Sequence, residues 1–242
     1  MGLFDKLKKK KAPVAKPADT FYTKEWLALF SACLGRMMVI QQNAYEHITK
    51  DQDWNVDLSE GSITFGSNKY PVQFIGSESD ISNTWMWGWN NVNNFPDHVL
   101  DLAYEMLETG NELELDPFRL AQFELDEVFN GQSLSIVACG ISKNEYFYFR
   151  CPHSNGAVLL AVGNLPKEVF TSVGAIEFAN LTMQCIQQYY IDHKLFVESL
   201  LKWNETAFEW NGDVLTAHFD QELNITFEQS GEQYRIIKMN IR

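Results

Sequence analysis

The chain contains no apolar run that approaches the roughly 18 residues needed to cross a bilayer, which excludes a membrane-spanning helix. Its four cysteines include no C-x-x-C pair, and the apolar stretch at the N-terminus is too short for a secretory signal peptide. We therefore expect a soluble protein of a reducing cytoplasm, with free thiols.

Motifs of the common enzyme classes are also missing. The sequence contains no G-x-G-x-x-G, no P-loop, no G-x-S-x-G and no H-E-x-x-H. Cys151 and His153 form the one close Cys/His pair, and no zinc-binding spacing accompanies it. We expect Cys151 to be a small, buried, inert residue. The sequence thus gives no argument for an enzyme, a cofactor or a metal site.

Basic residues are concentrated at the N-terminus. Residues 1–19 carry six lysines against Asp5 and Asp19, so a net charge of −13 for the chain leaves −17 on the remainder. Nucleic-acid affinity comes largely from lysines and arginines that release counterions from the phosphates. An acidic body of this kind argues against a nucleic-acid partner and favours a cationic one.

The first 19 residues are expected to form a solvated, disordered tail, as short charge runs usually do. Leu3, Phe4 and Leu7 lie on one side of a single helical turn, and lysines follow, so weak peripheral contact with an anionic membrane surface is the alternative. Pro13 and Pro17 then make an extended linker. Folded structure is expected from about residue 20.

Hydrophobic periodicity predicts an α+β fold in which long helices pack on curled antiparallel sheets. Residues 23–48 repeat apolar side chains at spacings of three and four, as a helix with a wide buried face does. Strand-like runs separated by turn sequences follow, at residues 54–58, 62–65, 70–77 and 83–90. The prediction is one helix followed by a four-stranded meander.

The same order returns near the C-terminus. Pro166 is predicted to open a helix that runs to Tyr190, with a second helical stretch at 192–201. Four strand candidates follow, at residues 206–210, 214–219, 223–228 and 234–241. We therefore expect residues 20–165 and 166–242 to form two packed parts, and duplication of a helix-plus-four-strand unit is a hypothesis from element order alone.

The segment between these runs is predicted to contain helices and a hairpin. The predicted helices are Asp97–Gly110, Leu120–Phe129 and Ser133–Cys139, and the hairpin joins residues 145–150 and 157–162.

A tryptophan-rich motif links the first part of the chain to a known family. The block Trp85-Met86-Trp87-Gly88-Trp89-Asn90 follows a W-x-x-D step that ends at Asp57 and a Gly61-Ser62 step. Together they resemble the signature of a bacterial family catalogued only as a domain of unknown function, over about the first two thirds of the chain. The resemblance implies a bacterial cytosolic protein and carries no activity or site.

The candidate binding residues of this motif are Trp85, Trp87, Trp89 and Asn90. Alternate side chains of a strand point to one face, so the indoles are predicted to form a row. Packed beneath the long helix, the row is core, which is the usual place for large aromatics. Partly exposed, it is a platform for a sugar, a base or a cation.

A second candidate surface is acidic. Asp101, Glu105 and Glu108 stand at i, i+4 and i+7 of the predicted helix Asp97–Gly110. Such a row binds a divalent metal or a basic protein in some proteins, and it is an ordinary solvated face in most. Few lysines lie nearby in the sequence, which favours a cationic partner.

These features favour a non-enzymatic, cytoplasmic bacterial binding protein whose acidic, aromatic surface engages a basic protein. Neutralising a cationic toxin domain, as an immunity protein does, is one concrete version. The alternative is a small-molecule binding protein or hydrolase with a pocket lined by Trp87 or Trp89. A third hypothesis, a membrane-tethered scaffold, depends on the lysine-rich tail.

Overall fold

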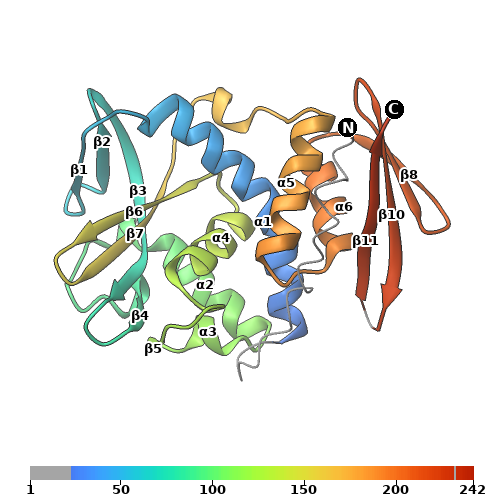
Figure 1. Cartoon of the computed structure of the whole chain (residues 1–242). Helices are drawn as coiled ribbons and strands as arrows, with labels where there is room; N and C mark the ends of the chain where they lie inside the picture. The colour runs from blue at the N-terminus through green and yellow to red at the C-terminus, as the bar shows by residue number, and fades with distance from the viewer. Residues whose placement is uncertain (1–22, 232) are drawn as a thin grey trace.

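The computed structural model describes residues 23–231 and 233–242. The predicted tail, the linker and the membrane contact of Leu3, Phe4 and Leu7 lie outside these residues. Within them, no helix combines the length and the apolar character that crossing a bilayer requires. The architecture is α+β, as predicted: two antiparallel sheets lie at opposite ends of the molecule with helices between them (Figure 1).

Helix α1 (Lys24–Ala44) runs through the middle of the molecule (Figure 1). Thr23 caps it by accepting a hydrogen bond from the backbone N–H of Trp26 (3.2 Å), and a π-helical turn (Tyr45–Thr49) extends it. The predicted helix is confirmed. Its buried positions follow the predicted spacing of three and four residues, since Trp26, Phe30 and Met37 all face the core.

Two other helices approach α1 closely at glycines. A Cβ on Gly35 would lie 3.1 Å from the Cβ of Leu200 in α6 (His193–Trp203). A Cβ on Gly140, in α4 (Gly131–Ile141), would lie 2.5 Å from the Sγ of Cys33. Helix α1 therefore packs against α4 in the first part of the chain and against α6 in the second.

The first sheet contains the predicted meander. Its strands are β1 (Trp54–Asp57), β2 (Ser62–Phe65), β3 (Asn68–Ser79), β4 (Thr84–Trp87), β5 (Gln122–Glu124), β6 (Phe147–His153) and β7 (Gly156–Val162). The order is β1-β2-β3-β4-β5, and β7 pairs with both β3 and β6. The predicted strands and the predicted hairpin are thus present, and the hairpin adds to the same sheet through β3.

The connecting helices agree with the prediction in two of three places. Helix α2 (Asp101–Glu112) follows a 3₁₀ turn (Asp97–Val99), and α4 covers the predicted segment at 133–139. A short helix α3 (Asp116–Arg119) lies between them.

The helix predicted at Leu120–Phe129 is wrong. Phe123 lies opposite Trp85 as part of strand β5, which extends the first sheet. The Asp126 carboxylate then accepts hydrogen bonds from the backbone N–H groups of Val128 and Phe129, both at 2.6 Å. An aspartate that bonds its own backbone two and three residues ahead stabilises a turn in place of a helix.

The helix predicted to begin at Pro166 starts later. A 3₁₀ turn (Lys167–Phe170) follows the proline, and α5 (Ala175–Gln188) begins only after an extended segment. Asn204 holds that segment extended, because its side chain accepts from the N–H of Val173 (2.7 Å) and donates to the Val173 carbonyl (2.9 Å). This partner is remote in sequence, so local periodicity did not reveal it.

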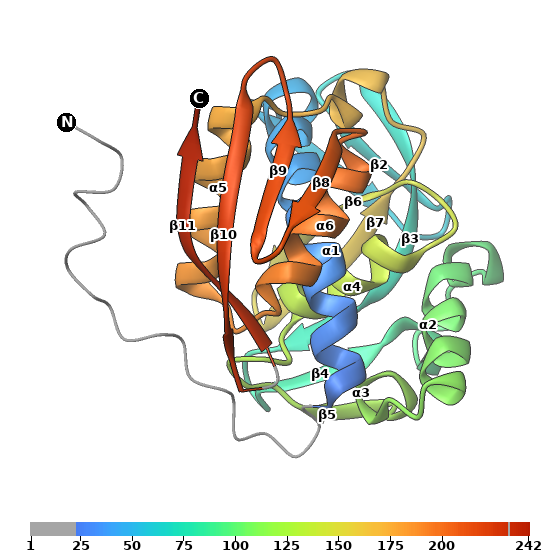
Figure 2. The same ribbon diagram turned by 90° about the vertical axis from the view of Figure 1, so that its right-hand side faces the viewer.

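The second sheet confirms the four predicted C-terminal strands. They are β8 (Ala207–Asn211), β9 (Val214–His218), β10 (Glu222–Ser230) and β11 (Gln233–Ile241), in the order β11-β10-β9-β8. The sheet covers α5 and α6 (Figure 2). Lys194 of α6 places its Nζ 4.4 Å from the ring centroid of Trp210 in β8 and 5.0 Å from that of Tyr234 in β11. Both edge strands contact one lysine, so the sheet curls around α6.

The two parts of the chain share one hydrophobic core. It includes Trp26 and Phe118 from the first part and Phe196 and Leu200 from the second. Both meanders have sequential strand order, while β5, β6 and β7 enlarge the first sheet. Duplication of a helix-plus-meander unit stays a hypothesis.

Candidate functional site

Two of the motif tryptophans belong to the core. Trp85 and Trp87 are 0% and 1% exposed, and their rings meet edge to face with centroids 5.3 Å apart. The Trp87 ring also packs on Phe118, which contacts Trp26 of α1. Its Nε1–H donates to the Pro117 carbonyl at 2.6 Å. Neither indole has surface to offer a ligand.

The third tryptophan does not continue the row. Strand β4 ends at Trp87, and Gly88–Asn90 form a 3₁₀ turn. A Cβ on Gly88 would lie 2.3 Å from the carbonyl oxygen of Phe74, so the chain passes directly against β3 at this point. Trp89 is half-buried and Asn90 is exposed. The predicted single-face row of three indoles is therefore wrong, because the strand is shorter than the motif.

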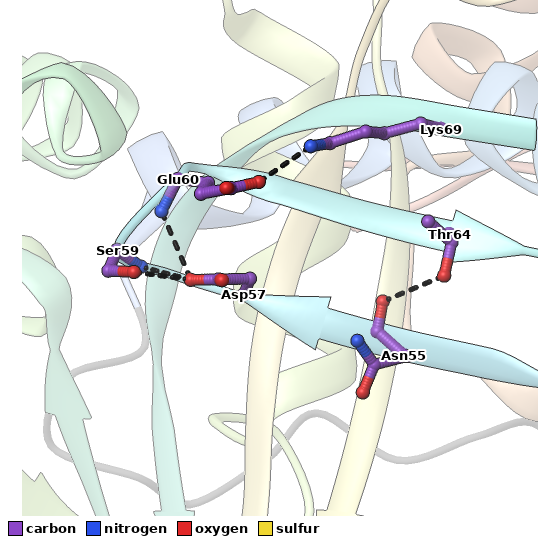
Figure 3. Close-up of polar contacts among 6 residues, drawn as sticks. All are labelled: Asn55, Asp57, Ser59, Glu60, Thr64 and Lys69. Atoms are coloured by element: carbon purple, nitrogen blue, oxygen red, sulfur yellow. Dashed lines mark hydrogen bonds and ion pairs between the residues drawn. The ribbon is translucent and has the colours of Figure 1, made fainter.

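Asp57, which ends the W-x-x-D step, stabilises the turn between β1 and β2 (Figure 3). The Asp57 carboxylate accepts hydrogen bonds from the hydroxyl of Ser59 (2.6 Å), its N–H (2.9 Å) and the N–H of Glu60 (3.1 Å). These bonds, the hydroxyl foremost, lower the pKa of Asp57. Lys69 of β3 pairs with Glu60 at 2.6 Å and so connects this turn to the next strand. The hydrogen bonds of Asp57 stay within the turn between β1 and β2, so they give Asp57 a structural role.

The four cysteines are buried free thiols. Burial raises the pKa of Cys33 to about 11, raises those of Cys151 and Cys185 to about 12, and raises that of Cys139. A thiol nucleophile needs a lowered pKa and access, and Cys151 has neither. Among the described residues, no three His, Cys, Asp or Glu side chains are arranged to hold a metal ion.

Helix α2 brings carboxylates to one face. We define the acidic α2 face as Asp101, Tyr104, Glu105, Glu108 and Glu112, which recur at helical spacings. All except the half-buried Glu105 are exposed, and Tyr104 keeps 43% of its surface accessible. The helix lies at the edge of the molecule, away from β11 (Figure 2).

The charges of this face are largely uncompensated. The sequence contains no lysine or arginine between Lys69 and Arg119, and Arg119 is paired with Asp116. In the described part of the chain, none of Asp101, Glu108 and Glu112 has a lysine or arginine nitrogen within 4 Å.

Glu105 differs from its neighbours because it has a structural contact. Its carboxylate accepts hydrogen bonds from the hydroxyl of Ser142 and from the backbone N–H of Lys143, both at 3.2 Å. These two residues follow the end of α4, so Glu105 fastens α2 to that helix. It contributes negative charge to the face and also helps to fix its position.

An open groove of about 450 Å³ lies beside the acidic α2 face. Its lining includes Gln73 of β3, Glu145 and Tyr146 before β6, Gly163 after β7, and Phe170. The Gln73 amide donates to the His98 carbonyl (2.8 Å) and accepts from the N–H of Leu102 (3.2 Å). One side chain thus connects the groove wall to the start of α2.

The groove and the α2 face are also coupled electrostatically. Burial raises the pKa of Tyr146, a hydrogen bond with Asn144 opposes this, and the carboxylates of Glu105 and Asp101 add to the increase. The two carboxylates thus add negative potential at the Tyr146 hydroxyl, although burial is the main cause of the raised pKa. The arrangement suits a cation better than an anion.

Sequence reasoning found the carboxylates of this region and missed the aromatic residues. Tyr104 stands three positions after Asp101, so helical spacing alone could have placed it on the same face. Tyr146 and Phe170 gave no such signal, because they come from separate segments that only the fold brings together.

A family model described as a family of unknown function (DUF6882) matches residues 27–165. The matched residues contain the tryptophan motif, the acidic α2 face and the groove except for Phe170, and they stop before the second sheet. No curated protein and no solved structure matches the chain.

Proposed function

We propose that this chain, which belongs to the DUF6882 family of unknown function, is a non-enzymatic binding protein that engages a basic protein through its acidic α2 face. The observation that carries the proposal is the row of unpaired carboxylates around the exposed Tyr104. We also propose a bacterial, cytoplasmic location, which the family resemblance suggests and with which free thiols agree.

Like charges at i, i+3 and i, i+4 destabilise a helix by about 0.2–0.5 kcal/mol per pair. In the described part of the chain, no lysine or arginine nitrogen lies within 4 Å of Asp101, Glu108 or Glu112 to offset this cost. A basic partner would remove the repulsion and would be steered toward the surface by the field. Tyrosine is enriched in protein interfaces, so Tyr104 gives such a surface an aromatic anchor.

Neutralisation of a cationic toxin domain is the concrete version of this proposal. An inhibitor of that kind needs only a complementary surface that covers the toxin, with no chemistry of its own. The sign of the charge and the exposed tyrosine on α2 support this version.

The alternative is a small-molecule binding protein or hydrolase, and its pocket would lie elsewhere than at the tryptophan motif. Trp87 is sealed in the core, so it lines no pocket. The groove at Tyr146 and Phe170 is the concave site that such a protein would use, and its volume falls within the usual range for small ligands.

The proposal is tested by neutralising the exposed carboxylates of the face in the triple variant D101N/E108Q/E112Q. Glu105 is left unchanged because it fastens α2 to α4. The matched control is E177Q/E205Q/E228Q, which changes the charge equally at exposed positions outside the matched residues.

Proteins retained from a bacterial lysate by wild type, variant and control are compared by mass spectrometry. We expect a basic protein to bind wild type and control and to be lost from the triple variant. Equal recovery by all forms, or recovery of no basic protein, would count against the proposal.

A further inference from the structure

The groove beside the acidic α2 face has room for one long side chain. Gly163 helps to shape it, since a Cβ there would lie 3.0 Å from Cε1 of Tyr146. The backbone of Gly163 is not left-handed, so the space taken by the tyrosine ring is what favours glycine at this position.

The lining combines aromatic rings with polar groups. Tyr146 and Phe170 are half-buried, so each ring is partly accessible to an occupant. Glu145 is exposed, and in the described part of the chain its carboxylate has no lysine or arginine partner. Lys143 and Lys167 are exposed on neighbouring residues, and neither lines the groove.

A guanidinium group fits this combination better than an ammonium group. Its plane stacks on aromatic rings, and its five N–H donors reach several acceptors at once. Glu145 and the side-chain oxygens of Asn144 and Asn164 are acceptors on the lining. A lysine ammonium is more strongly hydrated and cannot stack, so it gains less from the same walls.

We infer that the groove receives an arginine side chain of the basic protein, between Tyr146 and Phe170 and within reach of the Glu145 carboxylate. This inference rests on the proposed function and adds to it the side chain that the partner inserts. The α2 face then contacts the basic residues around that arginine, because Gln73 holds the groove and the start of α2 together.

The test measures binding of fluorescein-labelled hexa-arginine and hexa-lysine peptides to the full chain by anisotropy at low salt. We expect hexa-arginine to bind more tightly. Tyr146→Leu should weaken hexa-arginine binding by about three- to tenfold, the usual range for one cation–π contact, and should change hexa-lysine binding less. Tyr146→Phe keeps the ring and should retain the affinity.

Glu145→Gln is a second groove variant at an exposed position, so loss of folding does not complicate it. It should weaken hexa-arginine binding about twofold or more, as loss of one charged contact does. Melting temperatures by circular dichroism confirm that each variant is folded.

The outcomes separate the inference from the proposed function. If D101N/E108Q/E112Q weakens binding and the groove variants do not, the inference is overturned and the function stands. If the groove variants weaken binding and the triple variant does not, the inference stands and the proposed role of the acidic α2 face is overturned. Equal affinity of the two peptides with equal losses in Tyr146→Leu overturns the choice of arginine, and absence of hexa-arginine binding overturns both.

Discussion

Glu114 has a φ of +54°, a left-handed conformation that costs a residue with a Cβ about 1 kcal/mol relative to glycine. It follows Leu113, the C-cap of α2, and is exposed next to the acidic α2 face. Glu205 has a φ of +55° and follows α6 in the same way. Glycine is the residue usually found in this conformation after a helix. The two glutamates occupy equivalent positions, so a substitution at Glu205 is a control for the same substitution at Glu114.

We expect Glu114→Gly and Glu205→Gly each to raise the free energy of unfolding by up to about 1 kcal/mol, because both relieve the same strain. Urea denaturation measures this effect. Only Glu114→Gly should weaken binding of a basic peptide, since Glu114 lies next to the acidic α2 face and Glu205 follows α6. Equal binding by the two variants would show that Glu114 contributes no charge to the interface.

At the scale of elements, His193 joins α6 to the second sheet. Its Nδ1 accepts a hydrogen bond from the backbone N–H of Ile236 at 3.1 Å, which requires that this nitrogen carries no proton. Burial lowers the pKa of His193 to about 4, with help from Arg235 and against the effect of Asp192. An unfolded histidine titrates near 6.5, so the unfolded chain binds more protons between pH 4 and 6.5.

The free energy of unfolding should therefore fall as the pH is lowered from 6.5 to 4, by at most about 3 kcal/mol from this residue. His193→Asn keeps an acceptor without a titrating ring and should flatten that part of the profile. His47→Asn, at an exposed position, is the control. Melting temperatures across this range check the prediction, and parallel profiles for wild type and His193→Asn would contradict it.

Helices and strands with a periodic pattern of buried side chains were predictable from the sequence. Segments whose conformation depends on one distant side chain were not. Apolar residues recur every three to four positions in α1 and alternate with polar ones in both meanders, which marks the buried face of each element. These elements therefore agree with the prediction. The extended segment before α5 depends on Asn204, about 30 residues away in the chain. Residues 120–129 have helix-compatible composition, and the pairing of Phe123 opposite Trp85 decides their structure.

The candidate site divides in the same way. The carboxylates of α2 follow from helical spacing, which any amphipathic helix displays. The groove needs β3, β6 and β7 to be paired and Phe170 to line the same hollow as Tyr146, which no local pattern encodes. The row of three indoles was wrongly predicted because the W-x-W-x-W spacing continues beyond the strand. The strand ends at Trp87, and the next residue, Gly88, lies against the Phe74 carbonyl.

At the scale of the whole molecule, the shared core predicts a single cooperative unfolding transition, in which far-ultraviolet circular dichroism and tryptophan fluorescence coincide. A chain that ends at residue 165 should lose this cooperativity and bind the dye ANS. It would expose the side of α1 that Phe196 and Leu200 cover at Gly35. Two separate transitions in the full chain, or a cooperative melt of the shortened one, would contradict the prediction.

The approach of α6 to Gly35 has a consequence for how the family is delimited. The family model stops at residue 165, but the side of α1 that carries Gly35 is covered by Phe196 and Leu200, which lie beyond that limit. The stretch defined by sequence similarity is thus shorter than the part of the chain that shares the hydrophobic core. Any chain that carries only the matched stretch must cover the same side of its first helix with another element or with a second molecule.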